Sequence, residues 1–131
     1  MKLIRRKGVA IVQFKKGILV VSGKTKIFHL PGGGANKGES RKKATIRELY
    51  EETGLKTKKI KYLFSYKGKS WHNYNGRLVK NSVKVFLVEP IGKPKPRKEI
   101  KRIMFWNPEK KLRIGESTLN SIKKYLAKPI K

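Results

Sequence analysis

The sequence predicts an α/β protein in which helices cover a mixed β-sheet. Two observations support this prediction. Short apolar runs rich in Val, Ile, Leu and Phe have the length of strands, whereas two other segments place their apolar residues at helical spacing. These segments follow one another as strands, helix, strands, helix. The 131 residues contain no internal repeat and no Gly/Ser linker, so we expect a single domain spanning residues 1–131.

The first half of the chain is expected to form strands followed by a helix. The expected strands are residues 7–14, 18–24 and 26–30. The first two form a hairpin around Gly17, and the third leads into Pro31 and three glycines. A helix is predicted from Ser40 to Thr53, because Gly54 can take the left-handed conformation that commonly ends a helix.

The second half is expected to form further strands and a last helix. The expected strands are residues 59–68, 81–89 and 99–106. A polar loop, residues 68–77, should join the first two of these. Residues 92–98 hold two prolines and four cations, which predicts an exposed basic loop. The helix spans residues 117–126, with Ser117 as its N-cap and with Leu119, Ile122 and Leu126 at helical spacing.

The absence of certain features also limits what the protein can be. No apolar run approaches the roughly 18 residues that a membrane span requires. Cysteine is absent, which excludes disulfides and thiolate metal sites and leaves carboxylates and two histidines as the available side-chain ligands. We therefore expect a soluble, cytoplasmic protein that has no membrane partner.

Net charge is the outlying property of the composition. The chain has 35 Lys and Arg but eight acidic residues, all of them glutamate, for a net charge of +27. A thermophilic surface or compositional drift would account for many lysines. Ion-pair networks need both signs, however, and most of these lysines have no acidic partner. The excess therefore favours a polyanion as substrate or partner, RNA among the possibilities.

The scarce acid is concentrated in one place. Residues 33–55 hold four of the eight glutamates. At about 100° per residue, Glu48, Glu51 and Glu52 share one face of the predicted helix, opposite the side that should pack, which is formed by Ile46, Leu49, Tyr50 and Thr53. A solvated face neutralised by lysine is one explanation. The glycines before the helix favour another, because carboxylates and a closely approaching backbone suit Mg²⁺ or Mn²⁺ with substrate phosphates.

The spacing of these residues matches a known motif. Gly33, Glu39, the run Arg47-Glu48-Leu49, the pair Glu51-Glu52 and the pair Gly54-Leu55 follow the pattern GX5EX7REUXEEXGU, in which U is aliphatic. This stretch resembles the complete Nudix box, and the preceding LPGG also fits. The resemblance implies an α/β/α sandwich with a loop-helix-loop catalytic motif. It also implies an enzyme that hydrolyses a nucleoside diphosphate linked to another moiety, with Mg²⁺ or Mn²⁺ as cofactor.

The resemblance also implies roles for individual residues. The implied metal ligands are the Gly32 carbonyl, Glu48, Glu51 and Glu52. One of these glutamates would act as the catalytic base, and the sequence leaves open which one. Arg47 would orient a glutamate and Glu39 would brace the loop. Members of the family often add a glutamate from beyond the box, for which Glu99 is the first candidate and Glu89 the second.

Candidates for substrate contact lie outside the acidic helix. They are His29, Gly33, Gly34, Trp71, His72 and Tyr74. The aromatic residues of the loop after the box could stack on a base, or they could simply pack at the rim of the core. The PGGG run resembles that of enzymes acting on dinucleoside polyphosphates, which suits a highly anionic substrate.

Two classes of function fit these observations. The complete box favours a hydrolase of nucleoside or dinucleoside polyphosphates. The net charge favours an RNA-associated protein on the same fold, bound to the ribosome or acting on RNA 5′ ends, with or without hydrolysis. The two are compatible, because an RNA bearing a 5′ polyphosphate would use both features.

Overall fold

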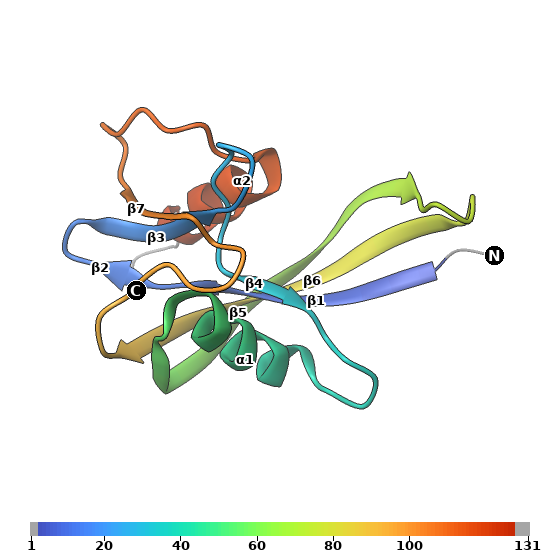
Figure 1. Cartoon of the computed structure of the whole chain (residues 1–131), viewed down its shortest axis with the longest axis horizontal. Helices are drawn as coiled ribbons and strands as arrows, with labels where there is room; N and C mark the ends of the chain where they lie inside the picture. Colours follow the sequence, from blue (N-terminus) through green and yellow to red (C-terminus); the bar gives the residue numbers. More distant parts are fainter. Residues whose placement is uncertain (1–2, 128–131) are drawn as a thin grey trace.

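The computed structural model describes residues 3–127. It contains two helices and seven strands, arranged as shown in Figure 1. The strands are β1 (Leu3–Ile11), β2 (Gln13–Phe14), β3 (Gly17–Ser22), β4 (Gly32–Gly34), β5 (Lys56–His72), β6 (Leu78–Ile91) and β7 (Arg102–Trp106). The helices are α1 (Arg41–Thr53) and α2 (Glu116–Leu126).

The larger sheet is mixed and has the strand order β4-β1-β6-β5. Strand β1 runs parallel to β6, from the pair Leu3 and Val79 to the pair Ile11 and Leu87. The other two pairings, β1 with β4 and β5 with β6, are antiparallel. A smaller antiparallel sheet has the order β2-β3-β7. The predicted mixed sheet is therefore confirmed.

The core lies on both faces of the sheet layer, because apolar side chains alternate along the buried strands. Val9 and Ile11 of β1 face a cluster that contains Ile122 of α2. Ala10 of β1 faces the opposite cluster, which contains Leu49 of α1. The two helices accordingly cover opposite sides, as Figure 1 shows, and the fold is the α/β/α sandwich that the sequence predicted.

Several predicted elements differ from the structure in extent. Residues 26–30 do not form a strand of the sheets and make two isolated bridges, Val21 with His29 and Phe28 with Ile114. The glycines Gly32–Gly34 form β4, which was not predicted. Glycine disfavours strands, so pairing with β1 creates this one. Helix α2 begins earlier than expected, with Gly115 and not Ser117 as its N-cap.

The first half of the segment predicted as a loop, residues 68–77, is strand. Strand β5 continues to His72 and β6 begins at Leu78, so that a turn of five residues joins them. Together with the start of β1, this hairpin extends away from the two helices toward the right of Figure 1. We call residues 67–80 the arm. Among residues 3–127, no helix is long and apolar enough to cross a membrane.

Candidate functional site

Helix α1 is fixed at both ends and along one side. The Ser40 hydroxyl accepts a hydrogen bond from the Lys43 N–H at 3.1 Å, and Gly54 ends the helix with φ of 78°. Thr45 packs so closely on Gly8 of β1 that a Cβ at Gly8 would collide with it. This close approach brings the acidic side of α1 against β4.

Glu52 is the most buried of the glutamates on α1, with 4% of its surface exposed. The helical wheel predicted that Glu52 lies opposite the packed side of the helix, which is wrong. It also predicted that Tyr50 lies on the packed side, whereas Tyr50 is 42% exposed. One Glu52 oxygen accepts a hydrogen bond from the Gly32 N–H at 3.1 Å. Burial raises the pKa of Glu52 to about 8, and the charges of Glu48, Glu99 and Glu51 add to the effect.

Glu48 lies directly against Gly32–Gly34, the glycines of β4, which we call the glycine loop. A Cβ at Gly33 would stand 1.8 Å from a Glu48 oxygen, so the carboxylate occupies the space that any larger residue would fill. Burial and the neighbouring Glu51 raise the pKa of Glu48 to about 7, although Arg47 opposes the shift. Two adjacent carboxylates therefore resist ionisation near neutral pH.

Arg47 connects the helix to the loop that precedes it. Its guanidinium donates to both oxygens of Glu39, at 2.9 and 3.0 Å, and to the Gly34 carbonyl at 3.1 Å. A third nitrogen donates to Glu48 and Glu51, both at 3.1 Å. The hydrogen bond from Arg47 lowers the pKa of Glu39 to about 2. Arg47 thus contacts both the glutamates of α1 and the loop that precedes it, and the orienting and bracing roles implied for Arg47 and Glu39 stay predictions.

The basic loop of residues 92–98 carries a further carboxylate to the site. The loop is largely exposed, as predicted, and it docks on the end of α1, where the Lys95 and Arg97 N–H groups donate to the carbonyls of Thr53 and Glu52. Lys98 then pairs with Glu51 at 3.5 Å. The charge of Glu99, the next residue, raises the pKa of both Glu48 and Glu52.

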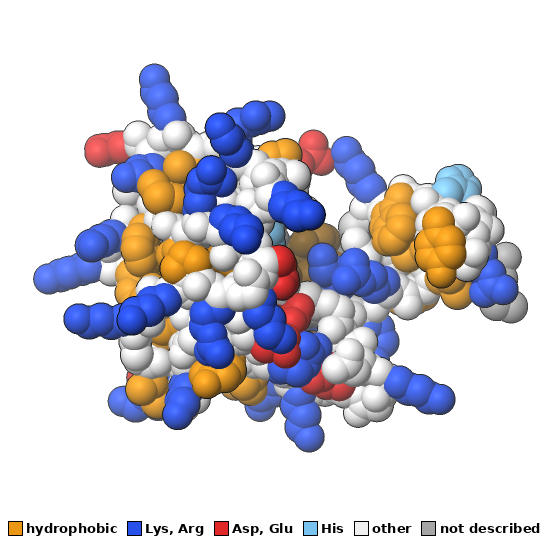
Figure 2. All heavy atoms as spheres, in the orientation of Figure 1, with side chains coloured by type: hydrophobic (Ala, Val, Ile, Leu, Met, Phe, Trp, Pro, Cys, Tyr) orange, Lys and Arg blue, Asp and Glu red, His pale blue; other side chains and the backbone are white. Residues whose placement is uncertain are grey.

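Glu99 is therefore close enough to act on the acidic cluster. Glu89, the second candidate, lies in β6 and pairs instead with the exposed Lys58 at 3.5 Å. Figure 2 shows acidic side chains gathered near the centre of one face, surrounded by Lys and Arg, at the edge of the hollow that separates the main body from the arm.

A cavity adjoins the acidic cluster. It is lined by Lys7, Val9, His29, Leu30, Gly32, Tyr66, Val83, Ser117 and Thr118. His29 thus stands where the sequence placed it, beside the glycine loop. Sequence reasoning missed Lys7 and Tyr66. Burial lowers the pKa of Lys7, whereas the charges of Glu52 and Glu48 act in the opposite direction, which shows how near this lysine is to the site.

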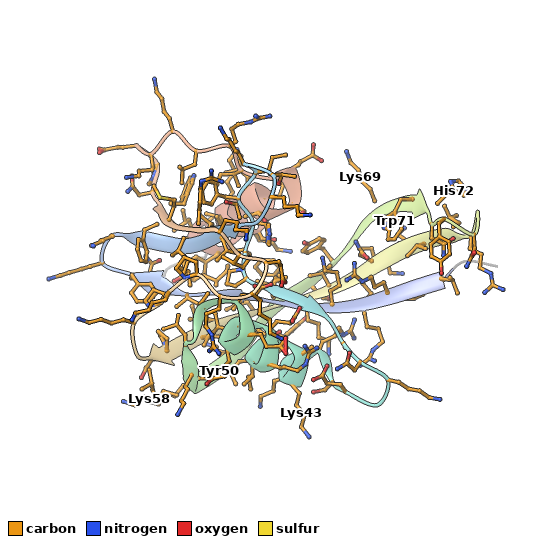
Figure 3. All side chains as sticks on the ribbon, in the orientation of Figure 1. Lys43, Tyr50, Lys58, Lys69, Trp71 and His72 are labelled. Atoms are coloured by element: carbon orange, nitrogen blue, oxygen red, sulfur yellow. The ribbon has the colours of Figure 1, made fainter. Side chains whose placement is uncertain are left out.

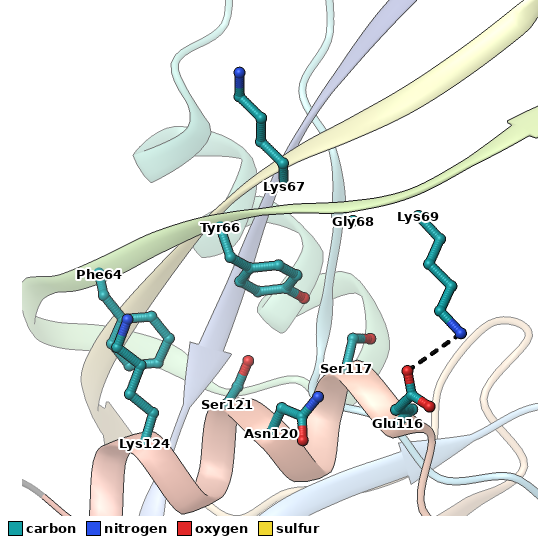
Figure 4. Close-up of a pocket in the computed structure, with 10 residues that line it drawn as sticks. All are labelled: Phe64, Tyr66, Lys67, Gly68, Lys69, Glu116, Ser117, Asn120, Ser121 and Lys124. Carbon is teal, nitrogen blue, oxygen red and sulfur yellow. Dashed lines mark ion pairs between the residues drawn. The ribbon is translucent and has the colours of Figure 1, made fainter.

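A second pocket opens between β5 and α2, as shown in Figure 4. It shares Tyr66 and Ser117 with the first cavity. Phe64 and Asn120 also line it, and an ion pair of 3.3 Å between Lys69 and Glu116 spans its edge. The two hollows together provide space beside the carboxylates for a group larger than a phosphate.

The other predicted contacts are not all brought together. Gly33 and Gly34 lie in β4, beside Glu48 and Arg47. Trp71 and His72 end β5, and Tyr74 lies in the turn that follows. Figure 3 shows Trp71 and His72 near the far end of the arm, well away from α1. Strand β5 carries these side chains away from the box, and their contact with substrate stays a prediction.

The donors at the site suit a divalent cation, although they do not form a finished metal site. Among the described residues, no group of three or more His or Glu side chains already surrounds a metal position. Arg47 forms an ion pair with Glu48, and Lys98 forms one with Glu51. Burial and mutual repulsion raise the pKa values of Glu48 and Glu52, and a bound cation would relieve both effects.

Part of the chain is similar to proteins named RNA pyrophosphohydrolase. It is 40% identical over 55 residues to the protein from Brucella anthropi, which is 42% of this chain and 29% of that protein. It is 44% identical over 45 residues to the protein from Agrobacterium fabrum, which is 34% of this chain and 26% of that protein. The chain thus spans less than a third of the length of these relatives.

The likeness to whole domains is more extensive. A nudix hydrolase family member from Chromobacterium violaceum has a TM-score of 0.77 and 33% identity, covering 94% of this chain and 77% of its own. A MutT NUDIX hydrolase from Burkholderia pseudomallei has a TM-score of 0.76 over 92% of this chain and 96% of its own, but its 20% identity supports the fold alone. The NUDIX domain family matches residues 4–127, and this chain therefore belongs to the Nudix family.

Proposed function

We propose that this chain is a pyrophosphohydrolase that cleaves a phosphoanhydride bond in a nucleoside or dinucleoside polyphosphate. One observation carries the proposal. Glu48 and Glu52 stand side by side at the glycine loop, half-buried and buried, where the Arg47 guanidinium and the Gly32 N–H hold them. Carboxylates held in this way can accept the proton that a water molecule loses as it attacks phosphorus.

The remaining residues of the site are assigned by their contacts. Arg47 holds Glu48 and Glu51 in place and is itself held by Glu39. Gly33 gives Glu48 the room to lie against the loop. Lys7 and His29 face the cavity beside Gly32, where they would contact the phosphates or the moiety attached to them. Proton transfer to Glu48 or Glu52 accompanies cleavage of the bridging P–O bond.

The cofactor in this proposal is Mg²⁺ or Mn²⁺. Glu48, Glu51, Glu52 and Glu99 and the Gly32 carbonyl would hold it. When bound, such an ion neutralises phosphate oxygens and lowers the pKa of a bound water. Carboxylate and carbonyl oxygens are the ligands that these hard cations prefer.

RNA with a 5′ polyphosphate is the second candidate substrate. The name of the partly similar proteins from Brucella anthropi and Agrobacterium fabrum favours it. The net charge of +27 also favours it, because a free nucleotide needs only a few cations. Both candidates would use the same carboxylates, so they differ in what holds the rest of the substrate.

The test is ³¹P NMR of protein purified at high salt. Nucleoside triphosphates, dinucleoside polyphosphates and 5′-triphosphate RNA are incubated with Mg²⁺, with Mn²⁺ or with a chelator. We expect turnover only with metal, and the products name the bond that is cleaved. Turnover should disappear in Glu52→Gln and persist in Glu109→Gln, a matched change of an exposed glutamate in the loop after β7.

Two results would count against the proposal. The first is a wild-type protein that leaves every substrate intact with both metals. The second is a Glu52→Gln variant that turns over as fast as the wild type, since the buried carboxylate would then have no part in the reaction.

A further inference from the structure

The arm has the charge and shape of a surface for a polyanionic strand. Residues 67–80 include four cations and no acidic residue, and residues 3–7 of β1, which run beside β6, add three more. The seven are Arg5, Arg6, Lys7, Lys67, Lys69, Arg77 and Lys80. Arg5, Lys7 and Lys69 lie on the face of the sheet that bears Trp71, whereas Arg6, Lys67 and Lys80 lie on the opposite face. Among residues 3–127, Lys69 alone of these forms an ion pair, and that pair with Glu116 is highly exposed and weak.

Two large aromatic residues stand on this basic surface. Trp71 is 42% exposed and Tyr74 is 97% exposed. They are not on a loose loop, because the Asn73 side chain accepts hydrogen bonds from the Asn75 and Arg77 N–H groups, each at 3.0 Å. The turn therefore holds the backbone at Tyr74 in a defined conformation, and Trp71 is positioned by its place in β5.

The arm is continuous with the candidate site. Tyr66 of β5 lines the cavity next to Gly32, and the same strand leads from Tyr66 to Trp71. At 3.3 Å per residue, Tyr66 and Trp71 are roughly 16 Å apart along the strand. Figure 2 shows the arm across the hollow from the acidic side chains. A strand that begins at the carboxylates would therefore reach the aromatics within a few nucleotides.

The positive charge of this surface determines which kind of partner can bind to it. A second copy of the chain would bring the same cations against it, and repulsion opposes that contact. Alternation of aromatic and basic side chains is typical of surfaces that bind single-stranded nucleic acid, where aromatics stack on bases and cations contact phosphates. Such a surface holds a strand without requiring a particular sequence.

We propose that the arm binds the single strand of an RNA whose 5′ polyphosphate is held at the carboxylates. Trp71 and Tyr74 stack on bases, and Arg5, Lys69 and Arg77 contact the backbone. This inference rests on the second substrate of the proposed function. It adds the surface that would distinguish an RNA end from a free nucleotide.

The first experiment measures binding without hydrolysis. A 5′-hydroxyl RNA oligonucleotide is titrated against the wild type, and anisotropy and tryptophan fluorescence are recorded. We expect Trp71→Ala and Tyr74→Ala each to weaken binding roughly tenfold. The wild-type emission should be quenched by the oligonucleotide and less so by an abasic one. The quench should vanish in Trp71→Ala, in which Trp106 is the remaining tryptophan.

A matched control lies on the same strand. Tyr62 of β5 is 50% exposed but lies in the other half of the strand, where it pairs with Phe86 of β6. Tyr62→Ala should bind RNA like the wild type. Melting temperatures of all variants check that the fold is intact. If the arm variants also bind like the wild type, or if abasic and normal strands quench equally, the proposal is overturned.

The second experiment separates this inference from the proposed function. We compare kcat/KM for a long 5′-triphosphate RNA with kcat/KM for a 5′-triphosphate dinucleotide, which is too short to reach Trp71. The ratio of the first to the second should fall roughly tenfold in Trp71→Ala. An unchanged ratio overturns the role of the arm while leaving hydrolysis intact. A wild type that hydrolyses neither substrate refutes the proposed function, and the binding assay still decides the arm.

Vesicles rich in anionic lipid provide the remaining control. Aromatic and basic side chains together can also insert at a membrane surface. A blue shift of Trp71 emission with these vesicles, combined with no quench by the oligonucleotide, would assign the arm to a membrane and overturn the proposal. DNA of the same sequence is tested in parallel, and tighter binding of RNA is expected if the 2′-hydroxyls are contacted.

Discussion

Charges at the candidate site are only partly balanced by neighbouring side chains. Arg47 contacts Glu39, Glu48 and Glu51, whereas Glu52 is buried against the Gly32 N–H. The pKa of Glu39 is accordingly lowered, and that of Glu52 is raised. In the absence of a cation the site therefore carries electrostatic repulsion, which costs folding stability when both Glu48 and Glu52 are ionised.

This imbalance predicts an unusual pH dependence for the metal-free protein. The folded-state pKa of Glu52, about 8, lies above the ordinary value of 4.5, so the folded state binds this proton more tightly than the unfolded state. The contribution to stability is complete below about pH 4.5 and is lost as the pH rises to about 8. With a chelator present, the melting temperature should fall between pH 5 and pH 8.5.

Glu52→Gln should flatten this curve, because glutamine does not ionise and its amide oxygen can still accept the Gly32 N–H. Glu116→Gln, a change of equal charge on the surface of α2, should leave the slope as in the wild type. Equal slopes in all three proteins would show that burial of Glu52 does not affect stability.

Gly33 and Gly34 provide a test of how closely Glu48 must approach the loop. A methyl group at Gly33 would lie 1.8 Å from a Glu48 oxygen and would displace that carboxylate. We expect Gly33→Ala to lose about 100-fold in kcat/KM, the typical cost of moving a catalytic group by an ångström, with little change in melting temperature. The measurement is the ³¹P assay, followed by thermal unfolding.

Gly34→Ala is the matched control. Its methyl group would meet the Arg5 side chain at 3.2 Å, and that side chain is exposed and can move aside. Its activity should stay near that of the wild type. A Gly33→Ala variant as active as Gly34→Ala would contradict the position of Glu48.

Among the elements, the loop of residues 92–98 joins the end of α1 to Lys98 and Glu99. Backbone hydrogen bonds join it to the last turn of α1, and the Arg97 guanidinium donates to the Tyr50 carbonyl at 3.2 Å while stacking on the Tyr50 ring at 4.8 Å. These contacts fix the loop on the helix that bears the acidic face. They therefore determine where Lys98 and Glu99 lie.

Arg97→Ala should loosen this docking. We expect a several-fold loss of kcat because Glu99 is no longer held beside Glu48 and Glu52, together with weaker binding of Mn²⁺. Lys95→Ala removes an equal charge from the same loop but leaves the Lys95 backbone bond to Thr53 in place, so its activity should change little. If both variants behave alike, charge rather than loop position is responsible.

Some of these elements could be predicted from the sequence alone, and others could not. Spacing and caps predicted α1 within a residue, and with it the acidic cluster, because those signals are local. Strand β4 was missed because its glycines have no strand propensity and because it forms by pairing with β1, which is distant in the sequence. The arm was missed because Asn and Gly residues in a polar stretch also suggest a loop. Burial of Glu52 could not be predicted from a helical wheel, since it depends on the loop that covers it.

At the scale of the whole molecule, charge is divided between a small acidic centre and a basic exterior. The chain carries a net +27, yet Glu39, Glu48, Glu51, Glu52 and Glu99 gather at one site. A metal-bound centre inside such a field would attract polyanions from any direction. Local contacts must then decide which part of a long anion is placed at the site.

Salt dependence measures how many phosphates the surface contacts. For single strands, log K falls with log salt concentration at a slope of about −0.7 for each phosphate contact. Lys69→Ala combined with Arg77→Ala should therefore reduce the steepness of the slope by about 1.4. Lys110→Ala combined with Lys111→Ala, two exposed residues of another loop, should leave it nearly unchanged. Equal effects of the two pairs would mean that the strand has no fixed path over the arm.

The parallel pairing of β1 with β6 has a consequence for folding kinetics. Helix α1 and the β5–β6 hairpin join residues that are near in sequence, whereas Leu3 of β1 pairs with Val79 of β6. Non-local pairs form slowly because a long chain segment must first be closed into a loop. Strand β4, which pairs with β1, can reach its final place only after β1 has docked. During refolding, activity should therefore return with the slow phase, after most helical signal has recovered.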